Sequence, residues 1–172
     1  MNYTPEDILI EREKRVNFQE ELLDRFGKTL VFIRVNYPGT KKDNDTAKEI
    51  IRVMDTLVEA MVSSVKIFKL IKITAEGPNI TMILDKEALE VKKISIEIED
   101  NHPLGRCVDI DVYSSEDKKS ISRETLGKAP RRCFICDESA KICVRSEKHE
   151  FKDVVDYIEK SYKCFKEAVN GI

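Results

Sequence analysis

Residues 29–35, Thr-Leu-Val-Phe-Ile-Arg-Val, have the composition of a β-strand. β-Branched and aromatic side chains dominate this stretch, and such residues favour strands. A turn at Pro38-Gly39 follows, and the spacing of apolar residues then predicts a helix over Asp45–Ser63. The central part of the chain therefore begins with a strand, a turn and an amphipathic helix.

Strands and helices continue to alternate after this helix. Lys66–Thr74 and Ile80–Leu84 are strand-like segments on either side of a glycine–proline turn, which predicts a hairpin. A short helix is predicted over Asp85–Val91, and strict alternation of isoleucine with polar residues predicts a strand over Lys93–Glu99. The order strand–helix–strand–strand–helix–strand is that of ferredoxin-like sheets built from split βαβ units.

Helices are predicted at both ends of the chain. Thr4-Pro5-Glu6-Asp7 is a strong helix start, and Gly27 ends the apolar pattern that follows it. A further strand is predicted over Cys107–Tyr113 and a C-terminal helix over Phe151–Val169. We expect a single α+β domain over 1–172, with a mostly antiparallel sheet and, as a candidate, a small zinc-binding element. Its segments are an N-terminal helical part (1–28), an α+β core (29–115), a basic, cysteine-rich part (116–150) and a C-terminal helix (151–172).

Composition excludes several classes of protein. The formal net charge is −2, which argues against a protein that coats nucleic acid or anionic lipid. The N-terminus lacks the pattern of a signal peptide, and no apolar stretch approaches the length of a membrane helix. The 5 cysteines are therefore expected to be reduced thiols or metal ligands in the cytoplasm.

A pair of aspartates lies on the strand predicted before Tyr113. In the sequence Gly105-Arg106-Cys107-Val108-Asp109-Ile110-Asp111-Val112, the valines and Ile110 would face the core, and Asp109 and Asp111 would project together from the other face. Two carboxylates placed in this way suit Mg²⁺ with substrate phosphate. The alternative is a solvated strand face.

The segment from Lys118 to Arg132 is strongly basic. It holds six basic residues and one acid, so it favours an anionic partner over a purely solubilising loop. His102, in the loop before the aspartate strand, is a candidate proton acceptor or phosphate contact, and a structural role in the turn is the alternative.

Four potential zinc ligands follow the basic segment. Cys133-X2-Cys136-X6-Cys143-X5-His149 contains one knuckle-like Cys-X2-Cys pair and a more loosely spaced second pair. Three cysteines and a histidine form a common tetrahedral Zn²⁺ site, whereas buried free thiols are the alternative. Cys107 and Cys164 are predicted to be packing residues.

These motifs together resemble one family. The resemblance is carried by His102-Pro103-Leu104-Gly105-Arg106, Asp109-X-Asp111, Ser122-Arg123, Leu126-Gly127, Arg131-Arg132-Cys133-X2-Cys136, Ala140, Cys143-X-Arg145 and His149. It extends to Arg12-Glu13-X-Arg15-X3-Gln19 and Pro38-Gly39-X2-Lys42, so it spans most of the chain. The sequence is thus similar to citrate lyase holo-acyl-carrier-protein synthases, also called apo-citrate lyase phosphoribosyl-dephospho-CoA transferases.

The resemblance implies a reaction and its partners. Such an enzyme moves phosphoribosyl-dephospho-CoA from its triphosphate precursor, triphosphoribosyl-dephospho-CoA, onto a serine of the citrate lyase acyl carrier protein and releases pyrophosphate. We expect no nucleic acid or membrane partner. Two alternatives stay open: transfer to another carrier, such as that of malonate decarboxylase, and a non-enzymatic zinc-ribbon module.

The candidate site residues divide by expected role. Asp109, Asp111 and His102 are the catalytic candidates, with Mg²⁺ on the two aspartates. Structural Zn²⁺ is expected on Cys133, Cys136, Cys143 and His149. The substrate-binding candidates are Gly105, Arg106, Ser122, Arg123, Arg131, Arg132 and Arg145.

Overall fold

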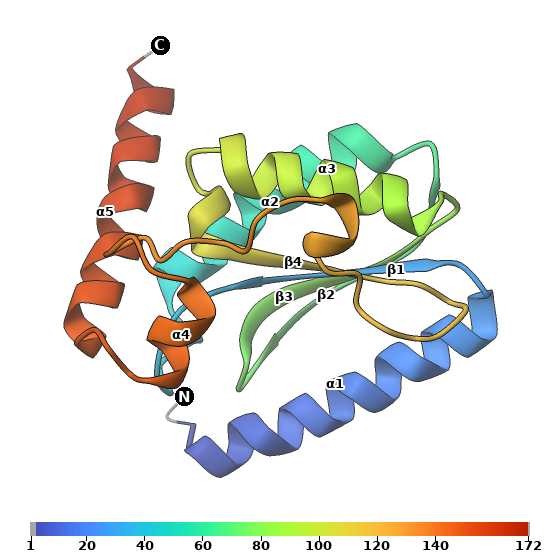
Figure 1. Cartoon of the computed structure of the whole chain (residues 1–172), viewed down its shortest axis with the longest axis horizontal. Helices are drawn as coiled ribbons and strands as arrows, with labels where there is room; N and C mark the ends of the chain where they lie inside the picture. The colour runs from blue at the N-terminus through green and yellow to red at the C-terminus, as the bar shows by residue number, and fades with distance from the viewer. Residues whose placement is uncertain (1–2, 172) are drawn as a thin grey trace.

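A computed structural model describes residues 3–171 as a four-stranded antiparallel sheet with helices on both faces (Figure 1). The strand order is β2-β3-β1-β4. Helix α1 crosses one face, α2 and α3 cover the other, and α5 stands at one end of the sheet (Figure 1). The bounds are α1 Pro5–Phe26, β1 Thr29–Val35, α2 Asp45–Val62, β2 Lys66–Thr74, β3 Gly77–Leu84, α3 Ala88–Asn101, β4 Val108–Tyr113, α4 Ala140–Arg145 and α5 Phe151–Asn170, with short 3₁₀ turns at Gly105–Cys107 and Glu124–Leu126.

The predicted α+β class is confirmed, and most elements lie where the sequence indicated. Thr4 caps α1: its hydroxyl accepts from Asp7 N (3.1 Å), while the Asp7 carboxylate accepts from Thr4 N (2.8 Å). This reciprocal pair satisfies backbone donors that a helix start leaves free. Gly27 ends the helix in the left-handed conformation, with φ 59°. These capping signals are sufficient to predict both ends of α1 because each depends on residues within one helical turn.

The strand predicted over Lys93–Glu99 is wrong. Residues 93–99 belong to α3, which begins at Ala88, so the predicted short helix over Asp85–Val91 is also misplaced. Val91, Ile94 and Ile98 are spaced by three and four residues, and this helical pattern coexists with the strand-like alternation. The fourth strand is β4 instead. The ferredoxin-like assignment stays a prediction.

Two apolar clusters hold the layers together. The larger one lies between the sheet and α2, α3 and α5, and the smaller one joins the C-terminal half of α1 to the opposite sheet face. The smaller cluster consists of Leu22, Leu23, Leu30, Phe32 and Ile83, with Phe18, Phe26, Phe68 and Tyr113 packed against it. The N-terminal half of α1 therefore extends beyond the apolar part of this face.

Strand β4 lies at the edge of the sheet, where polar side chains complete its hydrogen bonds. Ile110 N donates to the Glu99 carboxylate (3.0 Å), and Lys92 Nζ donates to Ile110 O (3.2 Å). Arg131 Nη1 donates to Val108 O (2.9 Å). Unpaired backbone groups at a buried edge cost free energy, so these three side chains stabilise the strand that carries the aspartates.

The C-terminal part of the chain contains less regular structure. Helix α5 packs through Ile158, which is fully buried, whereas Cys164 on the same helix is exposed, so the prediction that Cys164 is a core residue is wrong. Cys107 is buried as predicted. Among residues 3–171, no helix has the length and apolar character needed to cross a membrane.

Candidate functional site

The sheet face beneath α1 changes from apolar to polar along the strands. Strand register places three rows of side chains across β4, β1 and β3: Tyr113–Leu30–Ile83, then Asp111–Phe32–Thr81, then Asp109–Arg34–Asn79. The first row belongs to the small apolar cluster. The last row is fully polar and faces the N-terminal half of α1. The charged groups of this face therefore gather at one end of it.

Asp109 is the best-connected carboxylate of this region. It accepts from Asn36 Nδ2 (2.9 Å), Arg34 Nη2 (3.3 Å) and Arg131 Nη1 (2.8 Å). Asp111 lies on the same face, as the alternating burial of β4 requires. Burial raises the pKa of Asp111, and the neighbouring charge of Asp109 raises it further. The two carboxylates thus repel each other, and a cation between them would relieve that repulsion.

Helix α1 supplies two cations and an amide to the same region. Arg15 Nε and Nη2 lie 2.7 and 3.3 Å from the Glu76 carboxylate, and Nη1 donates to Gln19 Oε1 (3.1 Å). The Arg15 guanidinium also lies 4.6 Å from the centre of the Phe32 ring. Arg12 Nε is 3.7 Å from Glu76. Glu76, which is 5% exposed, therefore anchors two arginines of α1 over the sheet.

Lys42 and two buried donors complete what we call the polar cluster. Burial lowers the pKa of Lys42, and the charge of Arg34 lowers it further; its Nζ donates to Tyr37 O. Among the side chains of residues 3–171, four buried polar atoms lack a hydrogen-bond partner, and two of them, Arg34 Nε and Gln19 Nε2, belong to this region. Buried donors nearly always have an acceptor, so both atoms are available to an anionic or polar ligand. The polar cluster comprises Arg12, Arg15, Gln19, Arg34, Asn36, Lys42, Glu76, Asn79, Asp109 and Asp111.

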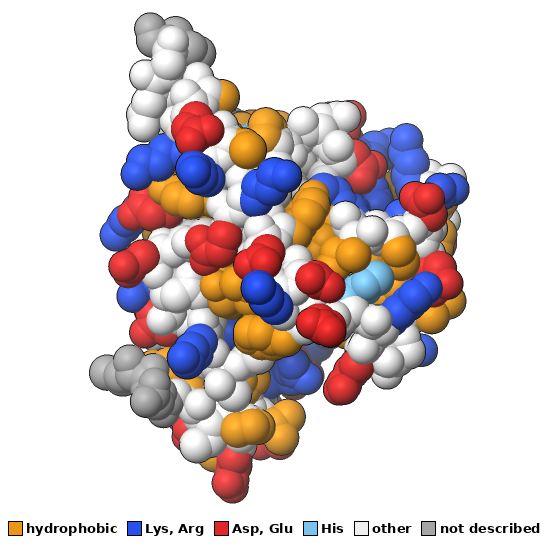
Figure 2. All heavy atoms as spheres, turned by 90° about the vertical axis from the view of Figure 1, so that its left-hand side faces the viewer, with side chains coloured by type: hydrophobic (Ala, Val, Ile, Leu, Met, Phe, Trp, Pro, Cys, Tyr) orange, Lys and Arg blue, Asp and Glu red, His pale blue; other side chains and the backbone are white. Residues whose placement is uncertain are grey.

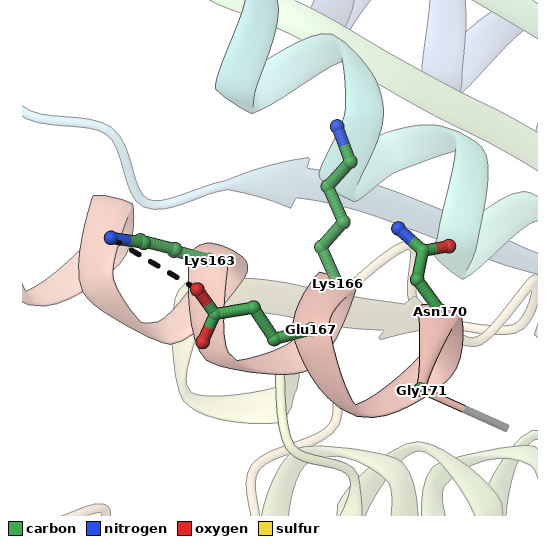
Figure 3. A pocket seen from close by; sticks show the side chains of 5 residues that line it. All are labelled: Lys163, Lys166, Glu167, Asn170 and Gly171. Carbon is green, nitrogen blue, oxygen red and sulfur yellow. Dashed lines mark ion pairs between the residues drawn. The ribbon is translucent and has the colours of Figure 1, made fainter.

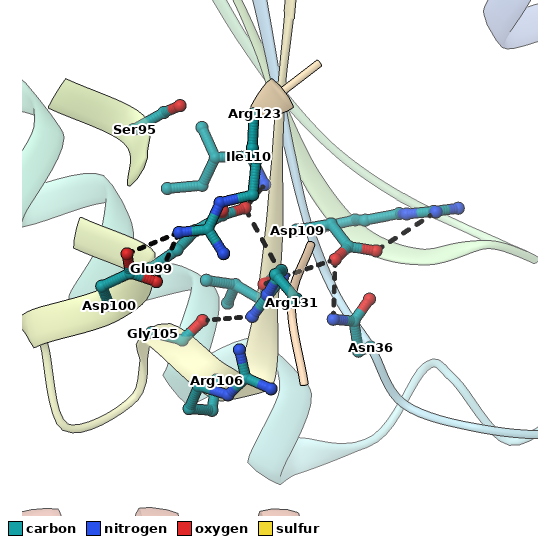
Figure 4. A network of polar contacts seen from close by, with 12 residues as sticks. Asn36, Ser95, Glu99, Asp100, Gly105, Arg106, Asp109, Ile110, Arg123 and Arg131 are labelled. Atoms are coloured by element: carbon teal, nitrogen blue, oxygen red, sulfur yellow. Dashed lines mark hydrogen bonds and ion pairs between the residues drawn. The ribbon is translucent and has the colours of Figure 1, made fainter. Parts of the chain in front are cut away.

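Of the predicted basic residues, Arg131 reaches Asp109. Figure 4 shows its guanidinium between Gly105 and Asp109, where Nη2 donates to Gly105 O (3.0 Å) and Nη1 to Asp109 Oδ1 (2.8 Å). Glu99 lies 3.5 Å from the same Nη1. Arg131 is mostly buried, with 15% of its side chain exposed. A buried arginine that joins a loop to a carboxylate in this way is a fixed part of the site.

The other predicted phosphate ligands have different surroundings. Arg123 is paired with Asp100 at the end of α3, 2.5 Å away (Figure 4). The Arg106 guanidinium donates to Arg132 O. Ser122 and Arg145 are exposed, and Ser122 Oγ lies 3.2 Å from the Thr125 hydroxyl. Their contacts with substrate stay predictions, as does that of Arg132, which is also exposed.

His102 and Gly105 shape the loop before β4. His102 Nδ1 accepts from Leu104 N (3.1 Å), and its ring centre is 5.5 Å from that of Phe165 in α5. Burial lowers the His102 pKa, which favours the neutral imidazole. Gly105 packs against the last turn of α3: an added Cβ would lie 2.2 Å from Ile98 O. Proton transfer by His102 stays a prediction.

The four predicted zinc ligands converge. The ligand atoms of Cys133, Cys136, Cys143 and His149 all lie within 4.8 Å of one another. Residues from the loop before α4, from α4 itself and from the segment between α4 and α5 are thereby brought to one point. The arrangement can hold a metal ion.

Surface hollows on α5 do not include these residues. One hollow lies at its C-terminal end, where Lys163 and Glu167 face each other 4.0 Å apart (Figure 3). A second is lined by Pro103 and residues 157–168. On the face around α5, acidic and basic side chains are interspersed (Figure 2). The candidate site is therefore defined by the polar cluster rather than by a surface hollow.

Sequence reasoning gave no roles to several members of the polar cluster. The sequence marks four of them only as motif positions shared with the family that it resembles: Arg12, Arg15, Gln19 and Lys42. Three further members are not among the predicted site residues: Arg34, Asn36 and Glu76. One signal was available: Arg34 is the only charged residue within the apolar stretch 29–35. A charge inside a buried strand requires partners.

Comparison with known proteins identifies a family whose match spans most of the chain. The family model described as apo-citrate lyase phosphoribosyl-dephospho-CoA transferase matches residues 3–165. A transferase of that name from Escherichia coli O7:K1 is 31% identical over 157 residues, which cover 89% of this chain and 85% of the relative. Protein CitXG of Haemophilus influenzae is 31% identical over 90% of this chain, and that of Leuconostoc mesenteroides is 28% identical over 94%. The chain spans only 34% and 35% of the length of these two relatives. It belongs to the apo-citrate lyase phosphoribosyl-dephospho-CoA transferase family.

Proposed function

We propose that this chain transfers phosphoribosyl-dephospho-CoA from its triphosphate precursor to a serine of the citrate lyase acyl carrier protein. The serine oxygen gives up its proton, for which His102 is the candidate acceptor, and forms a bond to the α-phosphorus, while the bond from that phosphorus to the leaving oxygen breaks and pyrophosphate departs with the electron pair. The observation that carries the proposal is the polar cluster. Motif residues from positions 12–19, 42 and 109–111 meet there, although they are far apart in the chain.

The charges of the polar cluster suit a triphosphate. Arg12, Arg15, Arg34 and Lys42 supply positive charge, and Arg131 adds a fifth cation beside Asp109. Arginine forks can hold phosphate oxygens by paired hydrogen bonds. The unpartnered Arg34 Nε and Gln19 Nε2 are donors that phosphate oxygens would satisfy. Binding would then orient the α-phosphorus toward an incoming hydroxyl.

The two aspartates fit a divalent cation. Asp109 and Asp111 share one strand face, and their mutual repulsion is what a cation would offset. When bound there, Mg²⁺ would neutralise charge on the phosphoryl oxygens. Arg34, Asn36 and Arg131 hold the Asp109 carboxylate in a fixed orientation, so that the ligand is in place before substrate binds. A non-enzymatic zinc-ribbon module would not require this arrangement of two aspartates and the side chains that orient Asp109.

Mass spectrometry of the carrier protein tests the proposal. The protein is incubated with apo carrier, the triphosphate donor and Mg²⁺, and the intact carrier is weighed. The expected result is a mass gain equal to one phosphoribosyl-dephospho-CoA group, absent when the acceptor serine is changed to alanine. An unmodified citrate lyase carrier would refute the proposed acceptor, and a malonate decarboxylase carrier in parallel would show whether the acceptor alone is wrong.

A further inference from the structure

We propose that Cys133, Cys136, Cys143 and His149 hold one structural Zn²⁺ ion, and that this ion fixes Arg131 against Asp109. The separations between the ligand atoms are close to those of a tetrahedral site. Cys136 Sγ lies 3.5 Å from Cys143 Sγ and 3.3 Å from His149 Nε2, and Cys133 Sγ lies 3.2 Å from the same nitrogen. Zinc bonds of about 2.3 Å to sulfur and about 2.0 Å to nitrogen place tetrahedral ligands roughly 3.5–3.8 Å apart.

The backbone around the first pair forms a knuckle. Ile135 N donates to Cys133 Sγ (3.4 Å), as expected where a thiolate sits at the mouth of a tight turn. Cys133 N donates to Glu138 O (2.7 Å) and Ala140 N to Arg131 O (2.9 Å), which closes the loop at its base. Four protein ligands leave no open coordination position for substrate, so the ion is structural.

The segment buries little apolar surface. Within 116–150, Cys143 is the only buried residue. Burial of apolar surface alone therefore does not offset the conformational entropy lost when this stretch becomes ordered. Metal binding supplies that free energy in small modules with little core.

The knuckle is connected to the polar cluster through Arg131. This residue lies two positions before Cys133, and its backbone oxygen is held at the base of the loop while its side chain reaches Asp109. Phe134 of the knuckle stacks on Tyr157 of α5, with ring centres 4.2 Å apart. The metal centre therefore fixes the backbone from which Arg131 extends. This second part rests on the proposed function, because Arg131 is there assigned to the donor site.

Metal analysis tests the first part without reference to activity. Protein purified without added metal should contain about one zinc per chain, and Co²⁺ replacement should give the intense visible bands of tetrahedral thiolate coordination. Cys136→Ser and His149→Ala should each lose the zinc. Cys164→Ser, which removes an exposed thiol of α5, should retain it. Wild-type protein that folds without metal and shows no Co²⁺ thiolate spectrum would overturn the zinc site.

Binding of inorganic triphosphate, measured by calorimetry, tests the second part. Cys136→Ser and Arg131→Lys should each weaken binding about tenfold, the scale of one lost charge-assisted hydrogen bond. The double variant should be no weaker than either single variant, since both remove the same contact. Wild-type protein stripped of zinc by a chelator should bind triphosphate as weakly as Cys136→Ser does, and added Zn²⁺ should restore its affinity. This measurement tests the inference even if the Cys136→Ser variant does not fold.

The outcomes of these experiments distinguish three claims: the zinc site, the positioning of Arg131 and the proposed transfer reaction. Additive effects, or unchanged triphosphate affinity in zinc-free protein, would overturn the positioning of Arg131 while the metal site stands. Zinc-loaded protein that binds triphosphate but leaves both carriers unmodified would refute the proposed transfer, while the zinc site would stand.

Discussion

At the scale of single residues, Asp109 and Asp111 carry the proposed chemistry. Asp109→Asn or Asp111→Asn should reduce transfer about a hundredfold or more, since each removes a carboxylate that we propose as a ligand of Mg²⁺. The fold should persist because asparagine has nearly the same shape. The measurement is the initial rate of carrier modification at saturating Mg²⁺, with Asp156→Asn on the exposed side of α5 as the control. A near wild-type rate in either variant would remove that aspartate from the site.

Glu99 gives a residue-scale prediction about pH. Burial raises its pKa, although Arg131 and Ile110 N favour the charged form. The folded protein keeps this proton to a higher pH than the unfolded chain does. The resulting stabilisation is therefore complete below the unfolded pKa of about 4.3 and is lost as pH rises through the folded pKa.

Glu99→Gln should remove this pH-dependent component. Its free energy of unfolding, relative to wild type, should increase as pH rises from about 4 toward neutrality. Urea unfolding at successive pH values measures the difference. Glu97→Gln, on the exposed side of the same helix, should follow wild type at every pH. Parallel curves for the Glu99 variant and wild type would show that burial of Glu99 carries no such cost.

At the scale of elements, the turn between α3 and β4 sets the position of the aspartate strand. An added Cβ at Gly105 would lie 2.2 Å from Ile98 O and 2.7 Å from Glu99 O. Backbone oxygens inside a helix cannot yield as a flexible side chain can. Gly105→Ala should therefore destabilise the protein by about 2 kcal/mol or more.

Thermal and urea unfolding measure the Gly105 effect. The matched control is Gly127→Ala, where open space surrounds the Cβ and the cost is limited to the left-handed backbone at φ 69°, about 1 kcal/mol. Equal losses in the two variants would contradict a special role for close packing at Gly105. Close packing against α3 thus gives a structural reason for glycine at position 105, which the sequence predicts as a substrate-binding residue.

Prediction from sequence worked where signals are local and failed where they conflict. The capped helix α1 and strand β1 follow from neighbouring residues. Residues 93–99 satisfy both strand and helix periods, and the choice depends on β4 taking the sheet edge, which is a tertiary fact. The shared face of Asp109 and Asp111 was predictable from alternation. Their proximity to Arg15 and Lys42 was not, because it depends on how α1 and the loop after β1 fold back over the sheet, and their proximity to Arg34 depends on the pairing of β1 with β4.

At the scale of the whole molecule, the C-terminal helix supports the loop that carries Asn36 and Lys42. The Glu159 carboxylate of α5 accepts from Tyr37 Oη (2.9 Å) and Thr46 Oγ1 (2.6 Å). Burial, and then Glu159, raise the pKa of Tyr37 to about 12, so the phenol keeps its proton and donates. Gly39 also lies directly against the Phe151 ring.

Glu159→Ala should therefore affect both stability and the distant polar cluster. Losing two hydrogen bonds to a charged acceptor should lower the free energy of unfolding by about 2 kcal/mol. The loop from Asn36 to Lys42 would lose its attachment to α5, and inorganic triphosphate should bind more weakly. Glu167→Ala is the control, because its pair with Lys163 is exposed and contributes little. Calorimetry and unfolding are measured on both variants. If Glu159→Ala lowers stability but binds triphosphate like wild type, then the loop keeps its position without α5, and the C-terminal helix supports the fold alone.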